Sequence, residues 1–219
     1  SFGLTQSNRR PDLYERVIDF VKFENAAGAN VRPQTTARGV GILFGLETRT
    51  PFDRAPSWKE LRGAVNGRKM QMVRDATFRQ TLISEADVHG TDGALVANMP
   101  FLNQDLSAVE SMLDDPLVTL GLADAGAHVG QIMDASQPTF FLTYWIRERE
   151  RWSIEEAVRR LTTDTADLFG IRNRGRLAVG AFADINVIDF DNLHLPHPEY
   201  VNDFPNGAGR YVQGSTGYD

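Results

Sequence analysis

The stretch that decides the fold is residues 116–130, Pro-Leu-Val-Thr-Leu-Gly-Leu-Ala-Asp-Ala-Gly-Ala-His-Val-Gly. Residues 117–123 form a short apolar run between a proline and a glycine-containing tail, which is typical of a buried parallel strand. Asp124 stands where this run stops. Because α/β barrels keep their chemistry at the carboxyl ends of their strands, Asp124 is a candidate catalytic residue. The alternative is that Asp124 caps the next turn and that His128 is an ordinary polar loop residue.

Composition excludes several classes of partner. The chain has 219 residues, with 23 Lys and Arg against 29 Asp and Glu, and its net charge is -6. Without a basic stripe, we expect neither a nucleic acid nor an anionic membrane as partner. The sequence has no cysteine, and no apolar run approaches the roughly 20 residues of a membrane span. We therefore expect a soluble, cytoplasmic protein, and its opening residues, which read as a strand end, indicate a fragment of a longer chain.

Helical and strand-like patterns alternate along the chain. Residues 11–24 carry apolar side chains at helical spacing, and residues 29–37 favour a strand. A second helix, capped by Asn103 or Asp105, leads directly into the strand of residues 117–123. Two such helix-to-strand steps in series predict a parallel α/β architecture.

Other segments give more local predictions. Residues 38–45 are rich in glycine and apolar side chains but lack a phosphate-loop pattern, so we expect a tight loop packed on the core. Ser57 begins a capping-box sequence for a short helix, and residues 69–82 read as another helix. Residues 139–149 predict a helix that faces the core, and Ser153 opens a further helix with a second capping box.

Three segments resemble the C-terminal part of the amidohydrolase superfamily. They are residues 120–130 (Leu-Gly-Leu-Ala-Asp-Ala-Gly-Ala-His-Val-Gly), residues 162–171 (Thr-Thr-Asp-Thr-Ala-Asp-Leu-Phe-Gly-Ile) and residues 174–190, which begin Arg-Gly-Arg-Leu-Ala-Val-Gly-Ala-Phe-Ala-Asp. The form Asp-Ala-Gly-Ala-His-Val-Gly, with Val-Arg-Pro-Gln-Thr at 31–35 and Gly-Ile-Leu-Phe-Gly-Leu-Glu at 41–47, is closest to the N-acyl-D-amino-acid deacylase (D-aminoacylase) branch.

This resemblance implies a hydrolase that cleaves the non-peptide C–N bond of an N-acyl amino acid or a related amide. It implies the C-terminal strands and helices of a (β/α)8 TIM-type barrel over residues 1–172 and part of a small β-sandwich over residues 173–219. Zinc is the implied cofactor, and Asp124 matches an aspartate that binds the metal region and passes a proton from the attacking water to the leaving amine. His128 is a candidate substrate contact or a residue that orients Asp124.

The sequence also departs from the family pattern. Its histidines are His89, His128, His194 and His197, and none matches the His-x-His pair and later histidines that hold the family's metal. The arginine that D-aminoacylases place soon after the aspartate has no counterpart, so Arg38 becomes the candidate for binding the substrate carboxylate, with an ordinary surface arginine as the alternative. A second interpretation is therefore an inactive partial barrel, which forms a homo-oligomer or pairs with a missing N-terminal part through its exposed edges.

Overall fold

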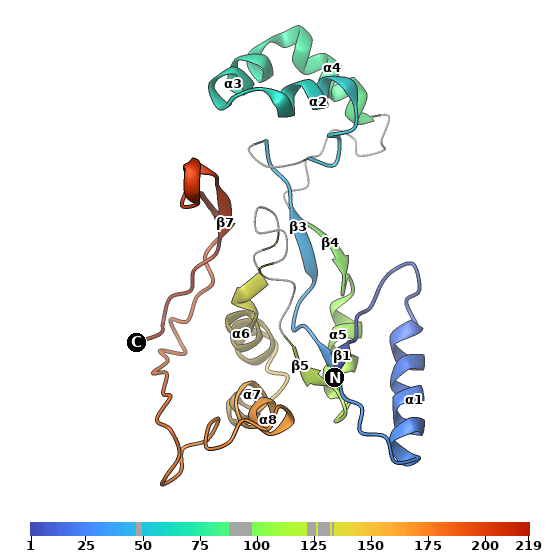
Figure 1. Ribbon diagram of the computed structural model, residues 1–219, viewed down its shortest axis with the longest axis vertical. Helices are drawn as coiled ribbons and strands as arrows, with labels where there is room; N and C mark the ends of the chain where they lie inside the picture. Colours follow the sequence, from blue (N-terminus) through green and yellow to red (C-terminus); the bar gives the residue numbers. More distant parts are fainter. Residues whose placement is uncertain (47–49, 88–97, 122–125, 127–131, 133) are drawn as a thin grey trace.

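The structure is a computed structural model that describes residues 1–46, 50–87, 98–121, 126, 132 and 134–219 (Figure 1). Helices and strands are mixed along the chain, which confirms the predicted α/β class. In chain order the elements are β1 (Phe2–Gly3), α1 (Leu13–Ala26), β2 (Pro33–Thr35), β3 (Val40–Leu43), α2 (Pro56–Gly63), α3 (Asn66–Arg74), α4 (Ala76–Asp87), β4 (Asn98–Leu102), α5 (Leu106–Asp114), β5 (Thr119–Leu120), η1 (Asp134–Ser136), α6 (Gln137–Phe140), the π-helix η2 (Phe141–Glu148), α7 (Ile154–Leu161), α8 (Thr163–Leu168), β6 (Glu199–Val201), η3 (Pro205–Gly207) and β7 (Arg210–Val212).

A parallel sheet of three short strands lies at the centre, in the order β1-β2-β5. Phe2 is paired with Pro33, and Gln34 with Thr119. Pro33 is the first residue of β2, a position where the missing backbone N–H does least harm to a sheet. Parallel strands need helical crossovers, and α1 and α5 supply the connections that the sequence predicts.

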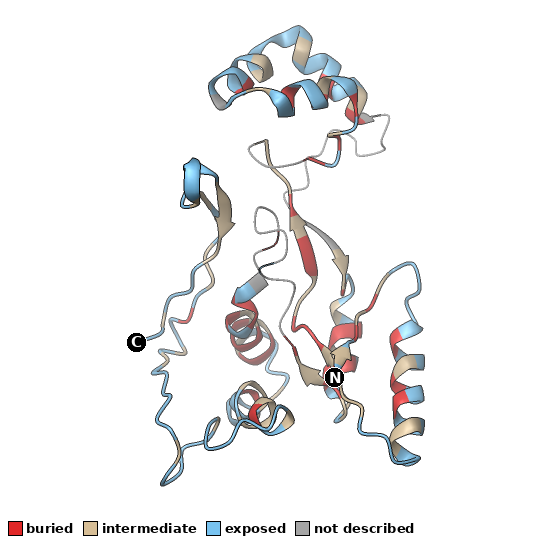
Figure 2. Cartoon of the chain, in the orientation of Figure 1, coloured by how far each residue is buried: buried red, intermediate tan, exposed pale blue. Residues whose placement is uncertain are grey.

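Helices α1, α5 and η2 bury their apolar faces beside this sheet, as the red segments of Figure 2 show. The π-helix η2 contributes the largest of these side chains, including Phe141 and Trp145, which are 0% and 1% exposed. The fully buried members of this main core are Leu4, Tyr14, Ile18, Ala37, Ala108, Val109, Met112, Leu113, Val118, Phe141, Leu142, Trp145, Ile146, Ala157 and Leu193.

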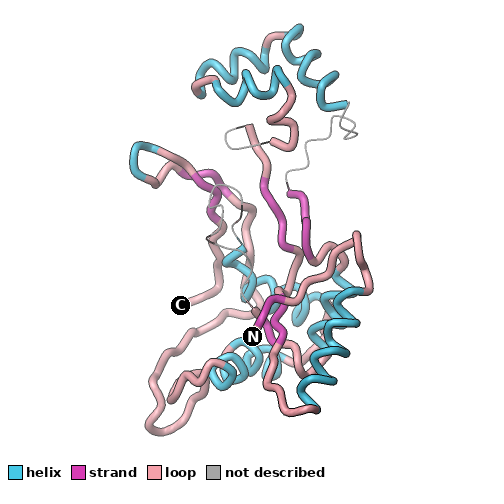
Figure 3. Tube along the Cα trace, turned by 45° about the vertical axis from the view of Figure 1, so that its right-hand side comes forward, coloured by secondary structure: helices cyan, strands magenta, loops and turns pink. Residues whose placement is uncertain are grey.

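An antiparallel arm leaves the carboxyl end of β2 and carries a small helical insert. Strands β3 and β4 form the arm, with Leu43 opposite Asn98 (Figure 3). Helices α2, α3 and α4 lie between these strands in the sequence and have a core of their own. The buried residues of this insert core are Phe52, Ala55, Trp58, Leu61, Leu82 and Ala86. The insert core shares no residue with the main core among the described residues.

The C-terminal segment, residues 173–219, is mostly extended and ends in the antiparallel hairpin of β6 and β7. Arg147 of η2 anchors it by donating hydrogen bonds to the carbonyls of Phe190 and Leu193, at 3.1 and 2.6 Å. Leu193 is 1% exposed and belongs to the main core. Before this anchor, however, most of the chain is exposed (Figure 2). The exposed apolar side chains there are Leu177, Val179, Phe182, Ile185 and Val187.

Several local predictions are confirmed and others are wrong. Helix α1 lies where residues 11–24 predict it, and Ser153 caps α7 by accepting a hydrogen bond from the Glu156 amide. Ser57 is not a cap, because its hydroxyl donates to Glu85 instead. Residues 38–45 contain the strand β3 rather than a tight loop.

One predicted helix is interrupted, and a second is continuous but mostly π-helical. Residues 69–82 span α3 and α4, which are separated at Asp75, where the backbone is extended. Residues 139–149 span α6 and the π-helix η2. No described helix is both long and apolar enough to cross a membrane.

Replacing Trp58 with alanine should unfold the insert while the parallel sheet stays folded. The Trp58 ring is 6% exposed, packs 4.8 Å from the Phe52 ring, and donates from Nε1 to the Leu82 carbonyl at 3.0 Å. Truncation of such a residue costs about 3–5 kcal/mol. Amide hydrogen exchange should speed up in α2 and α4 but not in α1 or α5.

The matched control is Phe23→Ala, at a side chain that is 70% exposed. This substitution should change the free energy of unfolding by less than about 0.5 kcal/mol. Equal loss of protection in α1 and α5 would contradict this prediction.

Candidate functional site

The carboxyl ends of the three parallel strands meet at one edge of the sheet. Leu4 follows β1, Thr36 follows β2 and Gly121 follows β5. The Leu4 amide donates to the Gln34 carbonyl at 2.7 Å, and the Gly121 amide donates to the Thr35 carbonyl at 2.8 Å. In parallel α/β folds, binding and catalytic groups gather at this edge. We call it the carboxyl edge.

Gln137 ties two of these strand ends together. Its side-chain oxygen accepts a hydrogen bond from the Ala37 amide at 2.6 Å, and its side-chain nitrogen donates to the Gly121 carbonyl. Gln137 is 4% exposed, and Trp145 adds a bond from Nε1 to the Ala37 carbonyl at 2.6 Å. Buried backbone groups need such partners because leaving them unpaired is costly. The chain after β2 is therefore fixed relative to the chain after β5.

Asn103 joins the same edge from the other side. Its side-chain nitrogen donates to the hydroxyls of Thr35 and Thr36 at 3.1 and 2.8 Å, and its side-chain oxygen accepts from the Gln6 amide at 2.8 Å. Asn103 is 1% exposed and has a φ of 52°, a left-handed conformation that asparagine tolerates better than most residues. The three strand ends thus share one buried polar network.

Gly121 packs closely against the Gln34 side chain at this edge. A Cβ atom placed there would lie 2.9 Å from Oε1 and 3.0 Å from Cβ of Gln34. Glycine is the residue that permits so close an approach between neighbouring strands.

Arg38 lies one residue beyond the pair of bonds at Ala37. Its Nη1 donates to the Ser136 hydroxyl at 3.3 Å, and its guanidinium carbon lies 5.3 Å from the centre of the Phe140 ring. Its backbone carbonyl accepts a bond from the Thr36 hydroxyl at 2.5 Å. The structure therefore places this predicted site residue at the carboxyl edge, and the side chain is half-buried there.

The other two predicted site residues, Asp124 and His128, lie outside the described residues, as does His89. Asp124 follows the last residue of β5 by four positions in the sequence. His194 and His197 belong to the C-terminal segment, where both are exposed.

The described residues do not by themselves supply a zinc site. No three His, Cys, Asp or Glu side chains converge within the described part of the chain. Zinc in proteins is held by three or four such ligands. The chemistry of these residues therefore does not fit a metal without further ligands.

The clearest pKa shifts have structural causes. Bonds from the Ser107 hydroxyl and amide lower the pKa of Asp105, the residue that caps α5. The hydrogen-bonded guanidinium of Arg210 lowers the pKa of Asp203, and burial raises the pKa of Tyr14. These groups act as a cap, an ion pair and a core residue, so the shifts do not point to a second reactive site.

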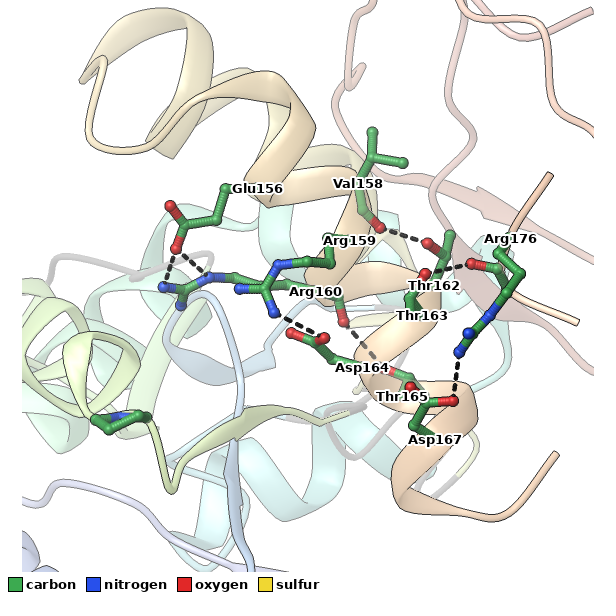
Figure 4. Close-up of polar contacts among 12 residues, drawn as sticks. Glu156, Val158, Arg159, Arg160, Thr162, Thr163, Asp164, Thr165, Asp167 and Arg176 are labelled. Carbon is green, nitrogen blue, oxygen red and sulfur yellow. Dashed lines mark hydrogen bonds and ion pairs between the residues drawn. The ribbon is translucent and has the colours of Figure 1, made fainter. Parts of the chain in front are cut away.

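A cavity of about 700 Å³ lies at the opposite, amino ends of β2 and β5, between α5, α7 and α8. Figure 4 shows how its charged side chains are paired: Arg159 donates to Asp164 at 2.9 Å, and Arg160 donates to Glu156. Because these charges already neutralise one another and this is the amino end of the strands, we place the site at the carboxyl edge instead.

The protein belongs to the amidohydrolase family. The model described as "Amidohydrolase family" matches residues 70–205, which is more than half of the chain. The chain is also similar to proteins described as N-acyl-D-glutamate deacylases. It is 46% identical to N-acyl-D-glutamate deacylase of Alcaligenes xylosoxydans xylosoxydans over 55 residues, which are 25% of this chain and 11% of that protein.

The fold is similar to a crystal structure of N-acyl-D-glutamate deacylase from Bordetella bronchiseptica complexed with zinc and a phosphonate inhibitor. The TM-score is 0.50 at 21% identity, over 88% of this chain and 40% of that chain. At this identity the likeness concerns the fold alone. The chain thus spans well under half the length of either relative.

Sequence reasoning missed most of the residues that hold the carboxyl edge together. Gln137 and Ser136 lie just before a segment that is predicted only as a core helix, and Asn103 is considered only as a cap. Because Ser136 and Gln137 lie in a polar stretch of the sequence, no local signal marks them, although a buried amide or hydroxyl must have a partner.

Replacing Gln137 with leucine should destabilise the protein without changing its volume much. The substitution leaves the Ala37 amide and the Gly121 carbonyl without their partner. Each unsatisfied buried group costs about 1–3 kcal/mol, so we expect a loss of about 2–5 kcal/mol in urea unfolding followed by circular dichroism. The same change at the exposed Gln71 of α3 should stay within about 0.5 kcal/mol of the wild type. A Gln137→Leu protein as stable as that control would contradict the role of the Gln137 side chain.

Proposed function

We propose that this protein acts in the hydrolysis of the amide bond of N-acyl amino acids. The observation that carries the proposal is the sequence Asp-Ala-Gly-Ala-His, which begins four positions after the end of β5, in a chain of the amidohydrolase family. The names of its relatives, both N-acyl-D-glutamate deacylases, favour an N-acyl-D-amino acid as substrate. Residues 1–172 would contribute the last strands and helices of a (β/α)8 barrel, and residues 173–219 part of a small β-sandwich.

Asp124 is the proposed proton carrier. Attack by water forms a C–O bond at the acyl carbon, and the carboxylate takes the proton that the water loses. The same proton then goes to the nitrogen as the C–N bond breaks, which releases a carboxylate and an amine. Acid–base assistance of this kind contributes about 10²–10⁴-fold to a rate.

Zinc belongs to the proposal because the similar solved deacylase is complexed with it. A bound zinc ion lowers the pKa of water toward neutrality. We assign Asp124 to the metal region, His128 to substrate contact or to orientation of Asp124, and Arg38 to the substrate carboxylate. Ligands beyond the described residues are needed to complete a zinc site.

The test is hydrolysis of N-acetyl-D-glutamate with and without added zinc, together with elemental analysis of the purified protein. We expect zinc-dependent turnover in the wild type and at least about a 100-fold lower kcat in Asp124→Asn, because the amide cannot accept the proton. His197→Gln, at an exposed histidine of the C-terminal segment, is the matched control and should keep full activity. Equal turnover by Asp124→Asn and the wild type would refute the role of Asp124.

A second candidate function is that of an inactive module that associates with itself. The observation that favours it is the row of exposed apolar side chains before the Leu193 anchor, including Leu177 at 81% and Val179 at 109%. In addition, β1 and β5 each have one edge without a strand partner among the described residues. Exposed edges and apolar patches promote association.

Light scattering coupled to size-exclusion chromatography, over a range of concentrations, tests this candidate. We expect a dimer or larger species, and Leu177→Lys should weaken its association by about tenfold or more because burial of a leucine is lost. Val65 of the insert is 76% exposed, so Val65→Lys is the matched control and should leave association unchanged. A monomer at every concentration would rule out the self-associating module.

A further inference from the structure

A chain of directed hydrogen bonds connects the C-terminal segment to Arg38. The Gln213 side-chain nitrogen donates to the Pro196 carbonyl at 2.8 Å, which fixes which way its amide points. The Gln213 oxygen then accepts the Ser136 hydroxyl at 2.6 Å. A hydroxyl group has one hydrogen, and Ser136 donates it to Gln213. Ser136 therefore acts only as a hydrogen-bond acceptor toward Arg38. The Arg38 Nη1 donates to the Ser136 hydroxyl oxygen at 3.3 Å.

Two further contacts restrict the guanidinium. The Phe140 ring lies 5.3 Å from its carbon, a favourable distance for a cation over an aromatic face. Phe140 is itself held against Tyr144 of η2, with ring centres 5.0 Å apart. The backbone of Arg38 is fixed by the Thr36 hydroxyl and by the Gln137 bond at the preceding residue. The arginine is therefore preorganised by residues from four parts of the chain.

The restricted guanidinium keeps most of its binding capacity. Among the described residues, Ser136 is the one hydrogen-bond acceptor of its five N–H donors, and no described carboxylate forms an ion pair with it. By contrast, Arg159 and Arg210 are paired with Asp164 and Asp203. With Nη1 engaged by Ser136, the edge formed by Nε and Nη2 has no partner among the described residues, and its geometry suits two parallel bonds to a carboxylate.

We propose that Ser136 and Gln213 are positioning residues that aim this edge of Arg38 at the α-carboxylate of the substrate. The proposal rests on the proposed function, in which N-acyl amino acids are the substrates. It assigns the α-carboxylate because every N-acyl amino acid has one, whereas the side chain varies. Recognition of the substrate would then also depend on the C-terminal segment, because Gln213 positions Arg38 without contacting the substrate itself.

Equilibrium binding by calorimetry tests the proposal without requiring turnover. The ligands are N-acetyl-D-glutamate and N-acetyl-D-isoglutamine, in which the α-carboxylate alone is replaced by an amide. We expect the wild type to prefer the acid by about 10-fold or more, as charge-assisted bidentate bonds do. Arg38→Met should abolish the preference. Gln213→Leu and, independently, Ser136→Ala should reduce it about 3–10-fold while leaving the affinity for the amide unchanged.

Two controls and one spectroscopic readout separate positioning from general damage. Arg210→Met removes a paired guanidinium, and Gln71→Leu removes an exposed amide; both should keep the wild-type preference. In ¹⁵N relaxation measurements, the Nε–H group of Arg38, assigned from its absence in Arg38→Met, should become more mobile in Gln213→Leu. A merely structural role for Gln213 would not change that resonance selectively.

Several results would overturn the proposal. They are equal affinity for acid and amide, no binding of either, a Gln213→Leu protein with full preference, or discrimination only against N-acetyl-D-glutamine, which lacks the side-chain carboxylate. A preserved preference without zinc-dependent turnover would instead refute the proposed function and leave the carboxylate assignment standing. Zinc-dependent turnover without a preference for the acid over the amide would refute the carboxylate assignment and leave the proposed function standing.

Discussion

The Gln137 side chain is the interaction on which the carboxyl edge depends. One amide bridges the backbone after β2 and the backbone after β5, using its oxygen for the Ala37 amide and its nitrogen for the Gly121 carbonyl. A neutral amide side chain offers a donor and an acceptor that are bonded to the same carbon, and so can serve both backbone groups. The three strands are two or three residues long, so their ladders alone hold few bonds. Side-chain bridges therefore define where the following loops start.

Local patterns predicted those parts of the fold that local physics decides. Helix α1 and the Ser153 cap follow from periodicity and from a hydroxyl that satisfies a free amide. The break at Asp75 and the π-helix η2 were not predicted. At Asp75 the cause is nonetheless local, because its side chain accepts a hydrogen bond from the Phe78 amide at 2.7 Å and so caps the start of α4. Strand β3 was taken for a loop since its glycines obscure the pattern, and its partner β4 lies far along the chain.

The sequence likewise predicted only part of the candidate site. The rule that chemistry follows a buried strand singled out Asp124, and the resemblance to deacylases led to Arg38. Neither argument leads to Ser136 or Gln213, because the partners in these bonds are separated by 98 and 77 positions. A single sequence does not show which distant residues form hydrogen bonds with each other. Ser136 and Gln213 both lie in polar stretches of the sequence, so nothing local marks either side chain as part of a buried or directed hydrogen bond.

The C-terminal segment has one part that is attached to the rest of the protein and one part that exposes apolar side chains. Each candidate function involves a different part. From residue 188 onward the segment is attached to the main core and to η1 by Arg147, Leu193 and the Ser136–Gln213 bond. Between residues 177 and 187 it instead exposes apolar side chains. Substrate recognition through Gln213 requires the attached part alone. Association through residues 177–187 would use the exposed part, and covering these side chains with a partner would leave the residues of the Arg38 network in place.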